Sequence, residues 1–306
     1  MQRKAVIAGG TGFLGSRLTC ALREAGWRVV CLSRHEEPGV VLWDGRTPGR
    51  WMNELEAAEL LVNFSGRSIA CVHTPDNRQE ILDSRINSTR VLAAAVARAE
   101  RPPKLWLQAS SLAHYGNPGE KLCSEATGPE ASDVFTTEVT RAWEKALFET
   151  ISPARQIAVR IGMILDAEAG GLVPLAHLTR AFLGGAAGSG RQYISWMHVA
   201  DFVAACQWVC DHPPAADGGW NFCAPNPATN ADFMKELRHA LHRPWAPPAP
   251  ALAVKVAAKE FMHTDPSLAL TGCRAEPRAL VDAGFKFRFP KLDGALADIA
   301  SRMKGR

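Results

Sequence analysis

The segment KAVIAGGTGFLG, residues 4–15, decides the fold of this chain. It starts as a short apolar run typical of a buried strand, and its apolar pattern then continues with helical spacing through Leu18 and Leu22. Between the two stand glycines in the order G-x-x-G-x-x-G. At a strand–helix junction such glycines permit a tight turn, let the backbone approach a pyrophosphate, and let the helix pack on the strand. The segment therefore predicts a dinucleotide site, and its candidate contacts are Gly9, Thr11, Gly12, Phe13, Leu14 and Gly15.

Strands and helices alternate through the first 110 residues. The apolar runs predict strands at residues 4–8, 27–32, 40–43, 60–64 and 105–109, and the periodic stretches predict helices at 14–25 and 79–99. Fully apolar strands separated by helices indicate a parallel sheet that is covered on both faces. The expected fold is α/β, a Rossmann-type doubly wound parallel sheet.

The pattern continues beyond residue 130 and then changes. We expect a helix at 133–150, a strand at 156–161, a glycine-rich stretch at 170–190, a helix at 199–210 and a strand at 219–223. Residues 225–250 are rich in proline around a helix at 230–241, and the tail predicts helices and a short aromatic strand at 285–289. We therefore expect a Rossmann domain formed by residues 1–164 and 196–224. A smaller C-terminal α+β lobe is expected from residues 165–195 and 225–306.

Composition excludes some classes of partner. The chain has 306 residues, 47% of them hydrophobic, and a formal net charge of only +4. No run of Lys or Arg exceeds two residues, so we expect no nucleic-acid binding. No apolar stretch has the length of a membrane span, and the N-terminus lacks the apolar region of a signal peptide. None of the eight cysteines forms a C-x-x-C pair, a pattern typical of reduced thiols, so a cytoplasmic protein is expected. We expect it to be a monomer or a homodimer.

The end of the second strand indicates which dinucleotide binds. An NAD site usually places an acidic residue there to accept from the ribose 2′-hydroxyl. Here the strand ends in Ser33-Arg34, which offers a hydroxyl and a guanidinium to a 2′-phosphate, while Glu36 and Glu37 come a residue or two too late. The sequence therefore favours NADP(H), the alternative for Arg34 being a solvated surface charge.

The next two strands also end in polar residues. Asp44 follows the third strand and is expected either to accept from the adenine amino group or to cap a turn. The fourth strand ends in a second group of candidate contacts, where the backbone is expected to pass the sugar and phosphates. These are Asn63, Phe64, Ser65 and Gly66.

With these motifs the chain resembles the extended short-chain dehydrogenase/reductases of the NAD-dependent epimerase/dehydratase superfamily. It is most similar to an atypical branch of predicted nucleotide-sugar epimerases that has its own C-terminal domain, and the resemblance covers nearly the whole chain. Besides the glycine segment, the motifs in the Rossmann part are Ser33-Arg34, Trp43-Asp44, Asn63 to Gly66, Ser84-Arg85 with Thr89, Ser110 with Tyr115-Gly116, Trp143-Glu144, and Arg160-Ile161-Gly162. The later ones are Gly184-Gly185, Gly188 to Gln192, Ser195-Trp196 with His198 and Asp201, Asn221, Ala224 to Pro227, Arg243-Pro244, and Gly284 to Phe287. The resemblance implies NADP(H) contacts from Ser33, Arg34, Phe64, Ser65, Glu80 and Arg85.

The catalytic residues of the wider family are missing. Its typical members use a Tyr-x-x-x-Lys pair, in which the lysine lowers the pKa of the tyrosine for proton transfer during hydride exchange. Val139 and Trp143 stand at those two positions here. The remaining candidates follow the fifth strand, whose end is expected to face the nicotinamide, and are Ser110, His114 and Tyr115. Ser110 would orient a substrate oxygen, and His114 or Tyr115 would carry the proton.

Further candidates lie later in the chain. The glycine-rich residues 184–196 with Arg191 are expected to form an anion site or a flexible loop. His198 and Asp201 are interpreted as capping and packing residues, because no third metal ligand is evident. Glu144 is expected on a helix surface.

Two functions follow from the sequence. One is an NADP(H)-dependent oxidoreductase or nucleotide-sugar epimerase that acts on a small molecule, with anionic compounds and nucleotide sugars as the candidate substrates. The other is a non-catalytic NADP(H)-binding sensor or interaction module, because the Tyr-x-x-x-Lys pair is absent.

Overall fold

The computed structural model describes residues 2–214 and 216–304. Within these residues a seven-stranded sheet has the order β11-β7-β5-β4-β1-β2-β3. All of its neighbouring strands run parallel. The strands are β1 (Lys4–Ala8), β2 (Arg28–Ser33), β3 (Val40–Leu42), β4 (Leu60–Asn63), β5 (Leu105–Ser111), β7 (Arg155–Ile161) and β11 (Gly218–Phe222).

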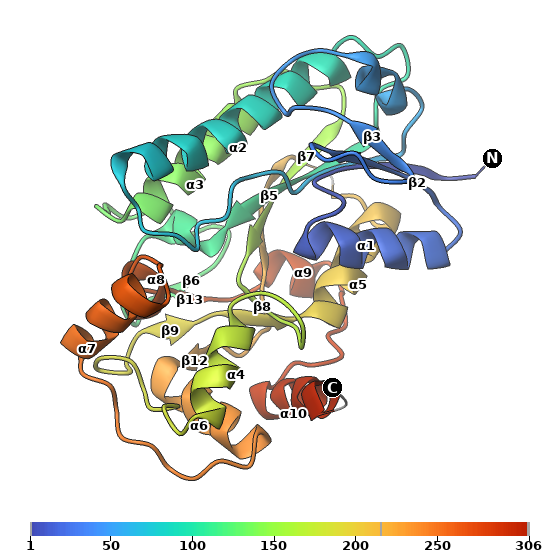
Figure 1. Cartoon of the computed structure of the whole chain (residues 1–306). Coiled ribbons are helices and arrows are strands. Elements are labelled where there is room, and N and C mark those ends of the chain that lie inside the picture. The colour runs from blue at the N-terminus through green and yellow to red at the C-terminus, as the bar shows by residue number, and fades with distance from the viewer. Residues whose placement is uncertain (1, 215, 305–306) are drawn as a thin grey trace.

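Helices cover both faces of this sheet. Figure 1 shows α2 (Pro75–Val96) and α3 (Phe135–Phe148) on one side and α1 (Phe13–Glu24) and α5 (Val199–Asp211) on the other. A short 3₁₀-helix, η1 (Arg50–Leu55), lies between β3 and β4. In residues 2–214 and 216–304, no helix combines the length and the apolar character that crossing a lipid bilayer requires.

The apolar strands explain the two layers. Successive residues of a strand point to opposite faces, so a strand that is apolar throughout contributes to two cores. In β1, Ala5 and Ile7 pack with Leu18 and Leu22 of α1, whereas Val6 and Ala8 pack in the core beneath α2. The predicted doubly wound parallel sheet is therefore confirmed, and the ends of the predicted strands of the sheet agree with the observed ones to within two residues.

A third apolar cluster lies beyond the carboxyl edge of the sheet. It joins β8 (Met163–Leu165) and β10 (Trp196–His198) to α4 (Leu172–Arg180), α6 (Asn230–Ala240) and α10 (Leu292–Lys304). Its fully buried side chains include Leu165, Trp196 and Phe233. The helix α4 lies inside the stretch that the sequence indicates only as glycine-rich, because Leu172 and Ala176 supply a buried face one turn apart.

The remaining elements are short. β8 pairs with β10 in parallel, β9 (Tyr193–Ile194) with β12 (Ala228–Thr229) antiparallel, and β6 (Leu122–Cys123) with β13 (Arg274–Ala275) in parallel. The other helical segments are η2 (Leu112–Tyr115), α7 (Ala251–Val256), the π-helical turn η3 (Ala257–Phe261), α8 (Ser267–Leu270) and α9 (Arg278–Asp282).

The strand predicted at residues 285–289 is wrong. This segment has no regular structure. Its backbone N–H groups at Arg288 and Phe289 donate to the carboxylate of Asp201, at 2.8 and 2.9 Å, instead of to a neighbouring strand. The aromatic side chains pack on each other, with the rings of Phe285 and Phe287 4.9 Å apart. The aromatic pattern thus indicates packing against α5 rather than a place in a sheet.

Candidate dinucleotide-binding site

The glycine turn between β1 and α1 is closely packed at Gly9 and Gly15, the first and last glycines of the G-x-x-G-x-x-G motif. Gly9 has a positive φ of 77°, and a Cβ there would lie 2.9 Å from the carbonyl carbon of Phe64. A Cβ on Gly15 would lie 2.1 Å from the carbonyl oxygen of Gly9. The fold itself therefore requires glycine at these two positions.

Gly12 is different, because the protein alone does not require glycine there. Its φ is −75°, and a Cβ would have Gly9 O at 3.3 Å as its nearest neighbour. Gly12 is also the N-cap residue of α1, and no side chain caps this helix start. An uncapped helix N-terminus beside open space is an anion-binding arrangement, so this observation fits a pyrophosphate.

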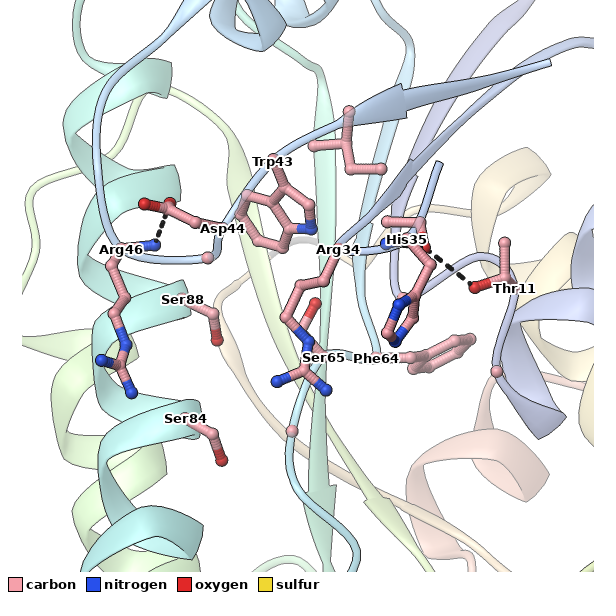
Figure 2. Close-up of a pocket in the computed structure, with 16 residues that line it drawn as sticks. Thr11, Arg34, His35, Trp43, Asp44, Arg46, Phe64, Ser65, Ser84 and Ser88 are labelled. Atoms are coloured by element: carbon pink, nitrogen blue, oxygen red, sulfur yellow. Dashed lines mark hydrogen bonds between the residues drawn. The ribbon is translucent and has the colours of Figure 1, made fainter. Parts of the chain in front are cut away.

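A pocket of about 200 Å³ opens beside this turn. Its walls come from the glycine turn, the ends of β2 and β3, the segment after β4, and one face of α2 (Figure 2). Nine of the predicted contacts line it, namely Gly9, Thr11, Gly12, Ser33, Arg34, Asp44, Phe64, Ser65 and Gly66. Seven further lining residues were missing from the sequence prediction, namely Leu32, His35, Trp43, Gly45, Arg46, Ser84 and Ser88. Trp43 and Ser84 belong to motifs already noted, which was the only sequence signal for this group.

The end of β2 presents Arg34 to the pocket. Ser33 is buried, and its Oγ accepts from the backbone N–H of His35 at 3.2 Å and lies 3.3 Å from Thr11 Oγ1. These contacts fix the strand end against the glycine turn. Arg34 is exposed, and among the described residues no carboxylate pairs with its guanidinium.

The segment after β4 holds a buried hydroxyl that lacks a partner. Asn63 is fully buried; its Oδ1 accepts from the N–H of Ser65 at 3.0 Å, and its Nδ2 donates to Gln108 Oε1 at 3.1 Å. Asn63 thus shapes the segment rather than the pocket surface. Ser65 Oγ is buried with no hydrogen-bond partner in the described residues, and Ser65 lines the pocket. Because buried hydroxyls are normally satisfied, this atom fits a ligand that completes its bonding.

Several predicted contacts lie outside the lining. Phe13 and Leu14 belong to the first turn of α1. Glu80 lies on α2 with its side chain 62% exposed and pairs with Arg67. Arg85 lies behind Gly66, where it donates to the carbonyls of Arg67 and Ile81 at 2.9 and 3.0 Å, and burial lowers its pKa to about 10.

Asp44 caps a turn. Its Oδ1 accepts from the N–H groups of Arg46 and Thr47, both at 2.8 Å, and its Oδ2 accepts from Thr47 Oγ1 at 2.7 Å. The backbone N–H of Thr47 is the largest cause that lowers the pKa of Asp44. Of the two roles expected from the sequence, the structure shows the turn cap.

A buried ion pair stands at the ends of β5 and β7, where catalytic residues were expected. Glu144 of α3 and Arg160 of β7 are 5% and 7% exposed. Arg160 Nε donates to Glu144 Oε1 and its Nη2 to Oε2, both at 2.9 Å. Burial alone raises the pKa of Glu144, but the contacts with His114 and Arg160 outweigh it and bring the pKa to about 2. The expectation of a helix-surface carboxylate is therefore wrong, because Glu144 faces the sheet.

The three catalytic candidates surround this ion pair. Ser110 Oγ donates to Glu144 Oε1 at 2.5 Å. His114 Nε2 lies 3.1 Å from Arg160 Nη2, and its Nδ1 lies 3.0 Å from Glu144 Oε2 without hydrogen-bond alignment. Since a guanidinium only donates, the contact between His114 and Arg160 has Nε2 as the acceptor.

Tyr115 is held by the same network. Its side chain is fully buried, its hydroxyl donates to Asn221 Oδ1 at 2.8 Å and accepts from Arg160 Nη1 at 3.0 Å, and burial raises its pKa to about 12. The structure thus brings the predicted Ser110, His114 and Tyr115 together. The structure also shows that Glu144, Arg160 and Asn221 contact the polar atoms of these three side chains.

Several donors of the glycine-rich residues 184–196 already have partners within the protein. Gly188 N–H donates to Ala249 O at 2.9 Å and Gly190 N–H to Ala187 O at 3.1 Å. Arg191 pairs with Glu120 at 2.6 Å. The expectation of an anion site is not supported, because neighbouring carbonyls and a carboxylate already take these donors.

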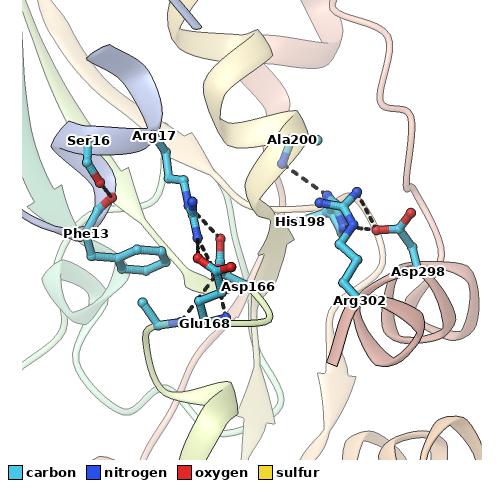
Figure 3. Close-up of polar contacts among 10 residues, drawn as sticks. Phe13, Ser16, Arg17, Asp166, Glu168, His198, Ala200, Asp298 and Arg302 are labelled. Atoms are coloured by element: carbon cyan, nitrogen blue, oxygen red, sulfur yellow. Dashed lines mark hydrogen bonds and ion pairs between the residues drawn. The ribbon is translucent and has the colours of Figure 1, made fainter. Parts of the chain in front are cut away.

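Polar contacts tie the sheet to the third apolar cluster (Figure 3). Arg17 of α1 donates to both carboxylate oxygens of Asp166 at 3.0 Å. His198 caps α5, its Nδ1 accepting from Ala200 N–H at 3.0 Å and its Nε2 facing Asp298 Oδ2 at 3.1 Å. The predicted capping role is confirmed. In the described part of the chain, no three His, Cys, Asp or Glu side chains are arranged to hold a metal ion.

Comparisons with known proteins extend these observations. Residues 5–137 match the NAD dependent epimerase/dehydratase family, and residues 249–299 match a domain of unknown function, DUF1731. The chain is 32% identical to epimerase family protein YfhF of Bacillus subtilis, over 97% of this chain and 98% of the relative. It is 30% identical to epimerase family protein SDR39U1 of Homo sapiens, over 97% of this chain and 100% of the relative.

A solved structure agrees in fold over the same length. The crystal structure of human epimerase family protein SDR39U1 (isoform 2) with NADPH has a TM-score of 0.87 and 29% identity, and covers 97% of this chain and 99% of that chain. The sheet order, the glycine turn and these matches lead to one conclusion. This chain belongs to the NAD-dependent epimerase/dehydratase family, which confirms the resemblance found in its sequence.

Proposed function

We propose that this protein binds NADP(H) in the pocket beside β1 and α1 and prefers it to NAD(H). The observation that carries the proposal is Arg34, an unpaired guanidinium at the end of β2 that lines the pocket where an NAD site would place a carboxylate. The human relative crystallised with NADPH supports it.

The residues of the pocket fit the parts of this molecule. The glycine turn and the uncapped start of α1 would hold the pyrophosphate, and Ser65 Oγ would donate to a ribose or phosphate oxygen. Ser33 and Arg34 would take the 2′-phosphate. Arg85 would support this site from behind Gly66. When bound, the nicotinamide supplies hydride chemistry.

Titration of NADPH and NADH fluorescence tests the proposal. We expect NADPH to bind at least about tenfold more tightly, as one charge-assisted hydrogen bond of about 1.5–3 kcal/mol implies. Arg34→Gln should remove most of that preference while NADH binding stays nearly unchanged. Equal affinities of the unmodified protein for the two nucleotides would refute the preference.

The geometry does not favour proton transfer by Tyr115, and it therefore favours a protein that binds the nucleotide over one in which Tyr115 is the proton carrier. The hydroxyl of Tyr115 lies fully buried between Asn221 and Arg160. If a small anionic substrate or nucleotide sugar is turned over, His114 is the better candidate to contact it, since its side chain keeps 12% exposure. Residues 165–195 and 225–306 would then form the lobe on the substrate side.

An absorbance assay distinguishes an NADP(H)-dependent enzyme from a non-catalytic NADP(H)-binding module. Purified protein with NADPH is mixed with a panel of carbonyl compounds and nucleotide sugars. Steady oxidation of NADPH that is lost in His114→Ala supports an enzyme, whereas tight NADPH binding without turnover across the panel supports a binding module.

A further inference from the structure

Arg46 lines the same pocket as Arg34 but comes from a different element. Arg34 ends β2, whereas Arg46 lies in the turn after β3. In Figure 2 the Arg46 side chain lies along α2 and the Arg34 side chain extends from the end of β2, with Ser84 and Ser88 of α2 between them; all four residues line the pocket. Both arginines are exposed, and in the described chain neither guanidinium pairs with a carboxylate. Two unpaired cations at one pocket mouth are a site for a highly charged anion.

The turn that presents Arg46 is held by Asp44. The Asp44 carboxylate accepts from Arg46 N–H and Thr47 N–H at 2.8 Å and from Thr47 Oγ1 at 2.7 Å. Gly45 between them has a positive φ of 73°, which a glycine adopts without strain. All of the strong bonds of this carboxylate are thus made within the turn. Of the two roles expected for Asp44, adenine contact or turn cap, these bonds correspond to the turn cap, and they fix the backbone position of Arg46.

We propose that Arg46 is the second cation that recognises the 2′-phosphate, and that Asp44 positions it. This inference rests on the proposed preference for NADP(H). A phosphate monoester carries about −1.5 to −2 charges at neutral pH, so one guanidinium leaves part of its charge unpaired. Arg34 and Arg46 together match that charge, and a ribose hydroxyl offers nothing to the second cation.

Binding of 2′,5′-ADP and 5′-AMP, measured by calorimetry, isolates this end of the nucleotide. The quantity compared is the ratio of the 5′-AMP dissociation constant to that of 2′,5′-ADP. Arg46→Gln should lower the ratio about fivefold, the upper end for an exposed ion pair, with 5′-AMP affinity nearly unchanged. Arg50→Gln is the matched control, because it removes the same charge from a nearby exposed arginine outside the pocket lining.

Other outcomes are equally clear. If Arg46→Gln changes the ratio no more than Arg50→Gln, or weakens both ligands equally as adenine stacking would, the role of Arg46 is refuted while the NADP(H) proposal stands. If the unmodified protein binds the two ligands equally, the proposed preference itself fails.

The positioning role of Asp44 has its own test. Asp44→Ala should lower the ratio as far as Arg46→Gln does, and add little further loss in an Arg46→Gln background. Asp44→Asn should keep most of the ratio of the unmodified protein, because the amide oxygen still accepts from the backbone N–H groups of the turn. Melting temperatures confirm that each variant is folded. A ratio in Asp44→Ala equal to that of the unmodified protein would refute the positioning role.

Discussion

Replacing Glu144 by glutamine removes the negative half of the buried network at the ends of β5 and β7. The substitution keeps the shape of the side chain but leaves the Arg160 guanidinium, 7% exposed, without its counter-charge. It also removes the carboxylate that accepts from Ser110. Losing one partner of a buried ion pair is far more costly than losing a surface pair. We therefore expect a large loss of stability in Glu144→Gln.

The pKa of Glu144 sets the magnitude. It lies at about 2 in the folded protein against an ordinary value of 4.5, and this difference corresponds to about 3 kcal/mol of folding stability. Because the folded pKa is the lower one, the contribution is fully present above pH 4.5 and is lost as the pH falls toward 2. By about pH 3 less than half of it should remain.

Urea unfolding of the unmodified protein and of Glu144→Gln, followed from pH 7 to pH 3.5, measures this contribution. The two free energies of unfolding should differ by about 3 kcal/mol at pH 7, and the gap should begin to shrink below about pH 4.5. Glu138→Gln is the matched control, since Glu138 is an exposed residue of the same helix and should cost no more than about 0.5 kcal/mol. A Glu144→Gln variant as stable as the control would refute the reasoning, as would a gap that does not change with pH.

Three further predictions concern the pocket and the network. Gly12→Val should abolish NADPH binding while the circular dichroism spectrum stays unchanged. The control Gly128→Val, at a glycine with open space around it, should bind NADPH normally. NADPH binding by Gly12→Val would mean that the turn holds no pyrophosphate. Ser65→Ala should weaken NADPH binding about two- to tenfold without lowering the melting temperature, because the hydroxyl has no partner within the described protein; a lowered melting temperature with unchanged affinity would contradict this. Tyr115→Phe should cost about 1–3 kcal/mol in urea unfolding because Asn221 Oδ1 loses its donor, and NADPH affinity should not change; unchanged stability would argue against the bond.

The sequence by itself determined the fold and predicted a dinucleotide as the ligand. The glycine segment at 4–15 and the apolar strands are local patterns, which can be recognised from residues that are neighbours in the chain. Arg34 could be found in the same way, because the strand end that faces the adenine ribose is fixed once the first strand and helix are placed.

Only the tertiary structure showed which groups the catalytic candidates contact. Glu144 and Arg160 lie on α3 and β7, and no spacing in the chain indicates that they form one ion pair around Ser110, His114 and Tyr115. The sequence showed that the Tyr-x-x-x-Lys pair is absent, but not what stands in its place. Buried charge pairs arise from contacts between elements distant in sequence, which periodicity does not report.

The same distinction applies to the turn after β3 and to the aromatic segment at 285–289. The sequence allowed two roles for Asp44, an adenine contact or a turn cap. In the structure its carboxylate accepts from the backbone N–H groups of the turn, and Arg46 of that turn lines the pocket. The aromatic segment has the composition of a strand, but the Asp201 carboxylate takes its N–H groups. In both places a carboxylate competes for backbone donors, and which donors it reaches depends on three-dimensional proximity rather than on residue type.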